Sequence, residues 1–168
     1  NYISIDDLNK AKAALEKERF YKMLSYERQY YGEGAKLIAG VDEAGRGPLA
    51  GPLVIAAVIL PEDVFISGLN DSKQISASKR AKLYDEVLQK AISVSVNIVS
   101  ISNIDELNIY RATQVGMSEV LLSLDVRPDV ALIDAMPVEA EDIKTDSLVH
   151  GGDVSAHIVA AAIEAKIS

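Results

Sequence analysis

Residues 36–61 read KLIAGVDEAGRGPLAGPLVIAAVILP, two apolar runs joined by a loop rich in glycine. The first run, 36–42, ends at the first residue of an acidic pair, and the second, 52–61, is mostly Val, Ile, Leu and Ala and ends in proline. Short apolar runs bounded by Gly and Pro predict buried β-strands. The two runs are close enough in sequence to pair as a hairpin, so this stretch predicts the start of a β-sheet.

A charged segment with helical spacing precedes the first strand, over residues 4–31. Ser4 or Asp6 is a suitable N-cap for this helix, and the GEG sequence at 32–34 ends it. Its charge density predicts a solvated helix that either lies against the body of the domain or forms an accessory arm.

Helices and strands alternate along the rest of the chain, without repeats, low-complexity tracts or linkers. In chain order, the patterns predict a helix from Ser76 or Ser78 through Lys90 with Leu83, Val87 and Leu88 facing inward, a half-buried strand at 91–101, a helix from Asn103 or Asp105 through Leu124, a strand at 129–137, a polar loop at 139–147 and an Ala-rich helix at 154–168. The pattern is that of one α/β domain.

The composition is that of a globular protein of 168 residues with 49% hydrophobic and 25% charged residues. No cysteine is present, which excludes disulfides and Cys-based zinc or redox sites and fits a reducing cytoplasm. A net charge of −8 argues against nonspecific binding to a nucleic-acid backbone. A divalent metal held by clustered carboxylates would reverse that local field. No apolar run is long enough for a membrane helix.

Acidic residues follow three of the apolar segments. Asp42 and Glu43 follow the first strand, Asp134 follows VALI, and Asp153 follows LVHGG and opens the last helix. Strand ends of one sheet bring such side chains together, and a hard oxygen site of this kind selects Mg²⁺ or Mn²⁺. Two ions about 3.5–4 Å apart would activate a water and stabilise the leaving oxygen of a phosphodiester. Without metal, at least one of these acids should have a raised pKa.

Each acid also has a simpler interpretation. Asp153 is a suitable N-cap for the last helix, and Asp134 is placed to accept hydrogen bonds in the following turn. Asp42 and Glu43 are close enough in sequence to Arg46 to form surface ion pairs. Spacing alone leaves these alternatives open.

The two loops that contain glycine or small polar residues have two interpretations as well. GRGPLAG at 45–51 is either a tight hairpin connection or, at 45–47, bare backbone that contacts a sugar or phosphate. DSK at 71–73 is either a loop before a capped helix or a Ser and Lys pair that reaches a phosphate.

Five segments together resemble type 2 ribonuclease H, also called ribonuclease HII. They are AGVDEAGRGPLAGPLVIAAVIL, LNDSKQISASKR, IDELNIYRATQVGM, ALIDAMP, and GGD before the Ala-rich helix. The resemblance begins near Lys36. It implies a ribonuclease H-like fold, a mixed central sheet flanked by helices, in a catalytic domain over 35–168. The helical extension at 1–34 looks like that of members from Gram-positive bacteria.

The resemblance implies an endoribonuclease that cleaves the RNA strand of RNA–DNA hybrids. It also implies cleavage 5′ of single ribonucleotides in duplex DNA, as the first step of ribonucleotide excision repair. The family uses a two-metal site with Mg²⁺ or Mn²⁺ and leaves 3′-OH and 5′-phosphate ends. A cytoplasmic, monomeric enzyme that does not associate with membranes is expected.

Functional residues carry over position by position from the resemblance. The metal-binding and catalytic acids are Asp42, Glu43, Asp134 and Asp153. The segment that contacts the ribose 2′-OH is Gly45, Arg46 and Gly47. Residues beside the nucleic-acid backbone are Asp71, Ser72 and Lys73, and those of the long helix near the substrate strand are Asn108, Thr113 and Gln114.

The sequence departs from the family pattern near its end. The usual lysine before the final Gly-Asp is Gly151 here, and the segment after Asp153 lacks the usual serine. His150 and His157 are unusual neighbours, expected on the surface or in helix packing. Family members normally continue through several more helices, which supply a tyrosine that stacks under the ribonucleotide and basic residues that grip the duplex. The alternative to an active enzyme is therefore a weak or inactive hybrid-binding domain.

Overall fold

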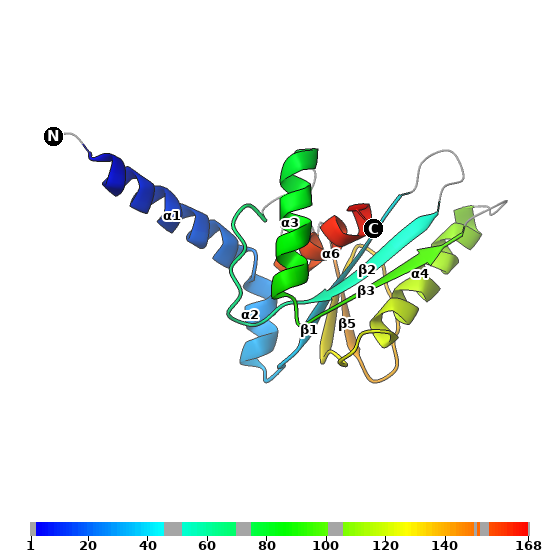
Figure 1. Ribbon diagram of the computed structural model, residues 1–168. Helices are drawn as coiled ribbons and strands as arrows, with labels where there is room; N and C mark the ends of the chain where they lie inside the picture. Colours follow the sequence, from blue (N-terminus) through cyan, green and yellow to red (C-terminus); the bar gives the residue numbers. More distant parts are fainter. Residues whose placement is uncertain are drawn as a thin grey trace.

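A five-stranded mixed sheet forms the centre of the protein (Figure 1). The computed structural model describes residues 3–45, 52–69, 75–100, 106–149, 151 and 155–167, with the backbone alone at 106–108. The strands are β1 (Ile38–Ala44), β2 (Leu53–Ile59), β3 (Ser93–Val99), β4 (Val130–Asp134) and β5 (Lys144–Leu148). Their order across the sheet is β3-β2-β1-β4-β5.

The first two strands pair as the sequence predicts. β1 and β2 form an antiparallel hairpin in which Val41 lies opposite Ala57. β3 is antiparallel to β2, whereas β4 is parallel to β1 and β5 is parallel to β4. All seven residues of β2 are buried, since it is central and covered on both faces. The predicted α/β fold with a mixed sheet is confirmed.

Helices cover both faces of this sheet (Figure 1). They are α1 (Ile5–Lys22), α2 (Ser25–Gly32), α3 (Ala77–Lys90), α4 (Glu106–Leu122) and α6 (Ala156–Ile167). One core cluster joins β2 to α3 and α6 and includes Val58, Leu83 and Ala160. A second cluster joins β1, β2 and β4 to α4 and includes Ile55 and Met117. Both clusters consist mainly of Val, Ile, Leu and Ala side chains.

The helix α6 lies directly on β1, and its residues from Ala156 to Ala165 are all buried. Gly40 permits this contact. A Cβ atom added at Gly40 would lie 2.2 Å from the backbone carbonyl carbon of His157. Only a residue without a side chain allows β1 and α6 to approach so closely.

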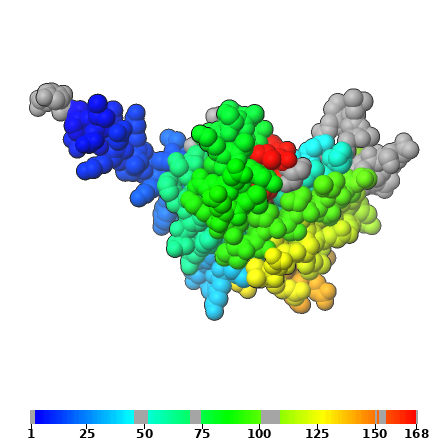
Figure 2. All heavy atoms as spheres, in the orientation of Figure 1, coloured from blue at the N-terminus to red at the C-terminus, as the bar shows by residue number. Residues whose placement is uncertain are grey.

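The prediction of a single helix at 4–31 is wrong in one respect, because the segment forms two helices, α1 and α2. Ser4 caps α1 as expected, and its hydroxyl accepts a hydrogen bond from the backbone N–H of Asp7 at 3.1 Å. The chain then turns at Met23 and Leu24, whose side chains are buried in the core. This turn lets α2 pack on the domain, while most of α1 projects from it as an arm (Figures 1 and 2).

Two other predictions are wrong. The region 139–147 contains the strand β5 rather than only a polar loop. β5 is an edge strand that backbone hydrogen bonds hold to β4, so its side chains can be polar. A polar sequence of this kind looks like a loop. Leu88 is 45% exposed, whereas Leu83 and Val87 face the core as expected.

No helix within the described parts of the chain is long and apolar enough to span a membrane.

Candidate metal and nucleic-acid site

Two acidic residues lie side by side at the carboxyl ends of β1 and β4. The parallel register pairs Val41 with Ile133, so the next residues along the two strands are Asp42 and Asp134. Neighbouring strands are about 4.8 Å apart, and paired residues of parallel strands point to the same face. The structure therefore brings together two acids that are far apart in the sequence, as predicted from their positions at strand ends.

The surroundings of the Asp42 carboxyl group disfavour its charged form. Burial raises the pKa of its carboxyl group to about 8, and the neighbouring Asp134 and Glu43 carboxylates add to this effect. A hydrogen bond at 2.8 Å from the backbone N–H of Glu43, and the positive charge of Lys166, act in the opposite direction. The expectation that at least one acid has a raised pKa is confirmed.

Asp134 is held in place by Gly151. The Oδ1 atom of Asp134 accepts a hydrogen bond from the Gly151 backbone N–H at 3.0 Å. A Cβ atom at Gly151 would lie 2.5 Å from the Cδ1 atom of Ile158 and 3.2 Å from Asp134 Oδ1. A side chain at 151 would therefore displace the end of the Ile158 side chain and contact the Asp134 carboxylate.

The N-cap contact of α6 that the structure describes is made by Ser155, whose hydroxyl accepts a hydrogen bond from the Ile158 backbone N–H at 3.3 Å. Asp153 itself lies outside the described residues. Among the residues that the structure describes, no three His, Cys, Asp or Glu side chains gather closely enough to hold a metal. The complete set of four acids therefore stays a prediction.

Several other predicted site residues also lie outside the described part of the chain. They are Arg46, Gly47, Asp71, Ser72 and Lys73, together with the side chain of Asn108. Gly45 is described, and its φ of +91° is a conformation that favours glycine. A Cβ atom there would lie 2.8 Å from the carbonyl oxygen of Pro52. The turn between β1 and β2 thus requires glycine at 45, whether or not its backbone contacts a substrate.

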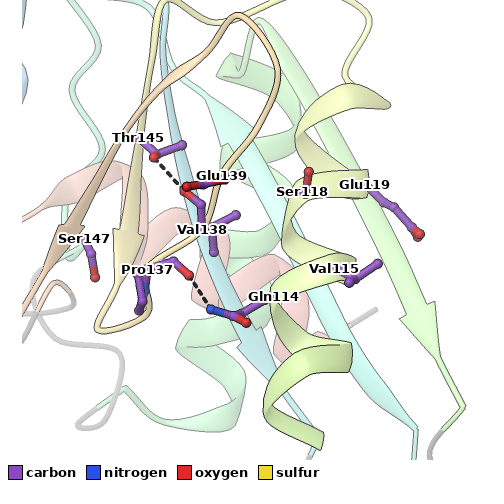
Figure 3. Close-up of a pocket in the computed structure, with 9 residues that line it drawn as sticks. All are labelled: Gln114, Val115, Ser118, Glu119, Pro137, Val138, Glu139, Thr145 and Ser147. Atoms are coloured by element: carbon purple, nitrogen blue, oxygen red, sulfur yellow. Dashed lines mark hydrogen bonds between the residues drawn. The ribbon is translucent and has the colours of Figure 1, made fainter. Parts of the chain in front are cut away.

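The residues Thr113 and Gln114 differ in their surroundings. Thr113 is buried, and its hydroxyl donates to the Ile109 carbonyl oxygen at 2.7 Å within α4. Gln114 is partly exposed and its side-chain amide donates to the Pro137 carbonyl oxygen at 2.8 Å (Figure 3). A substrate contact of either side chain stays a prediction.

Gln114 lines a groove of about 680 Å³ between α4 and the segments around β5 (Figure 3). Its lining consists of Gln114, Val115, Ser118, Glu119, Pro137, Val138, Glu139, Thr145 and Ser147. The two charged residues in this lining are both acidic, so the groove repels a phosphate backbone unless cations screen it.

Sequence reasoning missed two residues that act on the acids. Lys166 stands near the end of α6 and lowers the pKa of Asp42, which opposes the effect of burial. Gly151 orients Asp134 through its backbone. No local pattern identifies Lys166. Its closeness to Asp42 depends on the packing of α6 along β1, which brings the end of the helix near the acidic end of the strand.

Without divalent metal, the free energy of unfolding is expected to fall as pH rises from about 4 to about 8. The folded state raises the pKa of Asp42 from 3.8 to about 8, so between these values the folded protein holds a proton that the unfolded chain has lost. The stabilisation that this proton gives to the folded state is complete below pH 3.8 and is lost as the pH rises through about 8. Urea unfolding in EDTA across this range measures it.

Asp42→Asn is the matched variant for this measurement, since asparagine does not titrate. Its free energy of unfolding should depend less steeply on pH than that of the wild type. Glu164 is buried and its pKa is also raised to about 8, so part of the slope remains in the variant. Equal slopes for the two proteins would contradict the role given to Asp42.

Comparisons with known proteins bear on the family and the fold of this chain. The family model described as Ribonuclease HII matches residues 39–168. The Ribonuclease HII of Acetivibrio thermocellus is 48% identical over 166 residues, which are 98% of this chain and 65% of that protein. The chain thus spans just under two thirds of the length of this relative.

Solved structures with the same fold are more distant in sequence. The ribonuclease H2 of Pyrococcus horikoshii OT3 superposes with a TM-score of 0.66 at 24% identity, over 78% of this chain and 71% of that one. Bst-RNase HIII in complex with Mn²⁺ superposes with a TM-score of 0.54 at 19% identity, over 79% of this chain and 51% of that one. These two show the ribonuclease H-like fold alone. On the family match and the close relative, this chain belongs to the ribonuclease HII family.

Proposed function

We propose that this chain is a divalent-metal-dependent endoribonuclease. Its substrates would be the RNA strand of RNA–DNA hybrids and single ribonucleotides in duplex DNA, cut on their 5′ side. The observation that carries the proposal is the adjacent placement of Asp42 and Asp134, with a pKa of about 8 for Asp42. Partly buried, neighbouring carboxylates are unfavourable unless a proton or a cation compensates them.

The acids at this strand end carry the type of donor atom that a hard divalent cation binds. Asp42, Glu43 and Asp134 supply only oxygen atoms, the ligands that Mg²⁺ and Mn²⁺ prefer. We propose that these three residues and Asp153 hold two such ions. When bound, the ions would activate a water and stabilise the leaving oxygen, giving 3′-OH and 5′-phosphate ends. The Mn²⁺ complex of Bst-RNase HIII is consistent with this choice of metal.

The other residues of the chain would position the acids and the substrate. Gly151 orients the Asp134 carboxylate, and Lys166 favours the ionised form of Asp42. We propose that the backbone at 45–47 contacts the ribose 2′-OH, which distinguishes RNA from DNA. Contacts to the rest of the substrate are proposed for Asp71, Ser72, Lys73, Asn108, Thr113 and Gln114.

The organisation proposed for the chain has two parts. The helical extension is 1–34, and the catalytic domain is 35–168. We propose that the protein acts as a monomer in the cytoplasm, where ribonucleotides are excised from DNA.

The test is incubation of this chain with a labelled DNA duplex that carries one ribonucleotide, with Mg²⁺ or Mn²⁺. We expect one cut on the 5′ side of the ribonucleotide, with no cut in an all-DNA duplex and none in EDTA. Product ends can be identified by ligation and phosphatase treatment. Binding of the duplex without any cleavage above the EDTA control would instead select the hybrid-binding domain.

A further inference from the structure

A buried carboxylate joins the N-terminal helices to the last helix. Glu27 of α2 and His157 of α6 are both fully buried. The Oε2 atom of Glu27 accepts three hydrogen bonds, from the Ser155 hydroxyl at 3.2 Å, the His157 backbone N–H at 3.2 Å and the His157 ring at Nδ1 at 3.1 Å. Three donors on one oxygen fix the position of this carboxylate against the start of α6.

The ring of His157 is fixed from its other side as well. Its Nε2 atom accepts a hydrogen bond from the Leu60 backbone N–H at 3.1 Å. Nε2 therefore carries no proton, and Nδ1 must carry the proton that is donated to Glu27. His157 is a helix-packing histidine, one of the two roles expected for it, because both ring nitrogens are engaged and the ring has no access to solvent.

The first turn of α6 takes most of its capping from the N-terminal segment. The first backbone N–H groups of a helix have no partner inside the helix. Here the N–H of Ala156 donates to the Met23 carbonyl oxygen at 2.8 Å, and that of His157 donates to Glu27. The turn after α1 and the side chain from α2 thus supply two of these partners, and the negative charge at a helix N-terminus is itself favourable.

The same first turn leads to the acid site. The Ser155 backbone N–H donates to the Gly151 carbonyl oxygen at 2.9 Å, and the Gly151 N–H donates to Asp134 Oδ1. The side chain of Ile158, in the first turn of α6, also lies against Gly151. A continuous series of described contacts therefore runs from Glu27, through Ser155 and Gly151, to the Asp134 carboxylate.

We propose that Glu27 is a positioning residue for the metal site, acting through Ser155 and Gly151 on Asp134. The catalytic consequence rests on the proposed function, whereas the ordering of Gly151 does not. A purely structural role of Glu27 would stabilise the fold without affecting Gly151 or the reaction once the protein is folded. The helical extension would then contribute to catalysis without contacting the substrate.

The test compares three variants at one position. Glu27→Ala removes the acceptor, Glu27→Asp withdraws the carboxylate by one methylene, and Glu27→Gln keeps an oxygen that can accept the same hydrogen bonds. Glu33→Ala removes an exposed glutamate just after α2 and is the matched control. All measurements are made well below the melting temperature of each protein, at saturating metal.

Two readouts are expected to change together. Amide hydrogen exchange of Gly151 and of residues 156–158 should become faster in E27A and E27D than in the wild type. The kcat should fall by about 10-fold in E27A with KM unchanged, as for other groups that orient a metal ligand. E27Q should retain more of the wild-type kcat than E27D, and E33A should match the wild type. If E27A does not fold, the comparison of E27D with E27Q decides whether Glu27 orders Gly151 and supports the reaction.

The outcomes separate this proposal from the proposed function. Unchanged exchange at Gly151 in both E27A and E27D would overturn the proposal. Faster exchange with unchanged kcat would also overturn it, since the order at Gly151 would then have no effect on the chemistry. A wild-type chain that cuts no ribonucleotide substrate would overturn the proposed function. The exchange measurement would still decide whether Glu27 orders the residue that holds Asp134.

Discussion

Asp134→Asn is expected to lower kcat for ribonucleotide cleavage by about 10²- to 10³-fold, the effect of removing one preorganised electrostatic group from an active site. The substitution removes one of two adjacent negative charges while it keeps the shape of the side chain. Asparagine retains an oxygen that can accept the hydrogen bond from the Gly151 N–H. The loss should therefore appear in the reaction and in metal affinity, measured by single-turnover cleavage and calorimetry, rather than in folding.

Asp129→Asn is the matched control for this experiment. Asp129 stands just before β4, at the opposite end of the strand from Asp134. Its Oδ2 atom accepts hydrogen bonds from the backbone N–H groups of Lys36 at 2.8 Å and Leu37 at 3.0 Å, which lower the pKa of the carboxyl group. This variant should lose some stability but keep its kcat. Equal cleavage by Asp134→Asn and the wild type would show that Asp134 is not a metal ligand.

Gly40→Ala is expected to lower the free energy of unfolding by about 3 kcal/mol or more, at the upper end of the range for overpacked cores. The new Cβ atom would lie 2.2 Å from the His157 carbonyl carbon and 2.3 Å from its oxygen. These are backbone atoms in the middle of a packed interface and cannot rotate away. The helix α6 would have to move off β1, which also carries Asp42. Urea unfolding measures the loss.

Gly32→Ala provides the opposite case in the same protein. Gly32 is the last residue of α2, and a Cβ atom there has nothing within 4 Å. Alanine should stabilise the protein by about 0.4–1 kcal/mol, because it reduces the freedom of the unfolded chain. If the two variants had the same stability, the close contact between Gly40 and α6 would be wrong.

The parts of the fold that the sequence predicts are those with a local pattern. The apolar runs of β1 and β2 and the capped helix α3 each carry their own signal, and each lies close to its predicted place. β5 has no such signal, because polar side chains at an edge strand resemble those of a loop. The turn at Met23 and Leu24 has none either, because burial against a distant helix decides it.

In the candidate site, too, the features with a local sequence pattern were predicted and those that depend on tertiary contacts were not. The acids stand out at strand ends, so their positions in the sequence identify them. The partnership of Asp42 with Asp134 depends on the parallel register of β1 and β4, which no local pattern contains. Glu27 was missed because a glutamate in a highly charged segment looks like a surface residue, whereas here it is fully buried.

The contact between Glu27 and His157 also determines when the protein can complete its fold during synthesis. The two residues are 130 positions apart in the chain. At roughly 5–20 residues per second, the ribosome reaches His157 roughly 7–26 s after Glu27. During that interval α2 has neither the helix it caps nor a buried partner for its carboxylate. The helix α2 thus reaches its final contacts long after it is made, and Asp134 and Gly151 are made within the same interval.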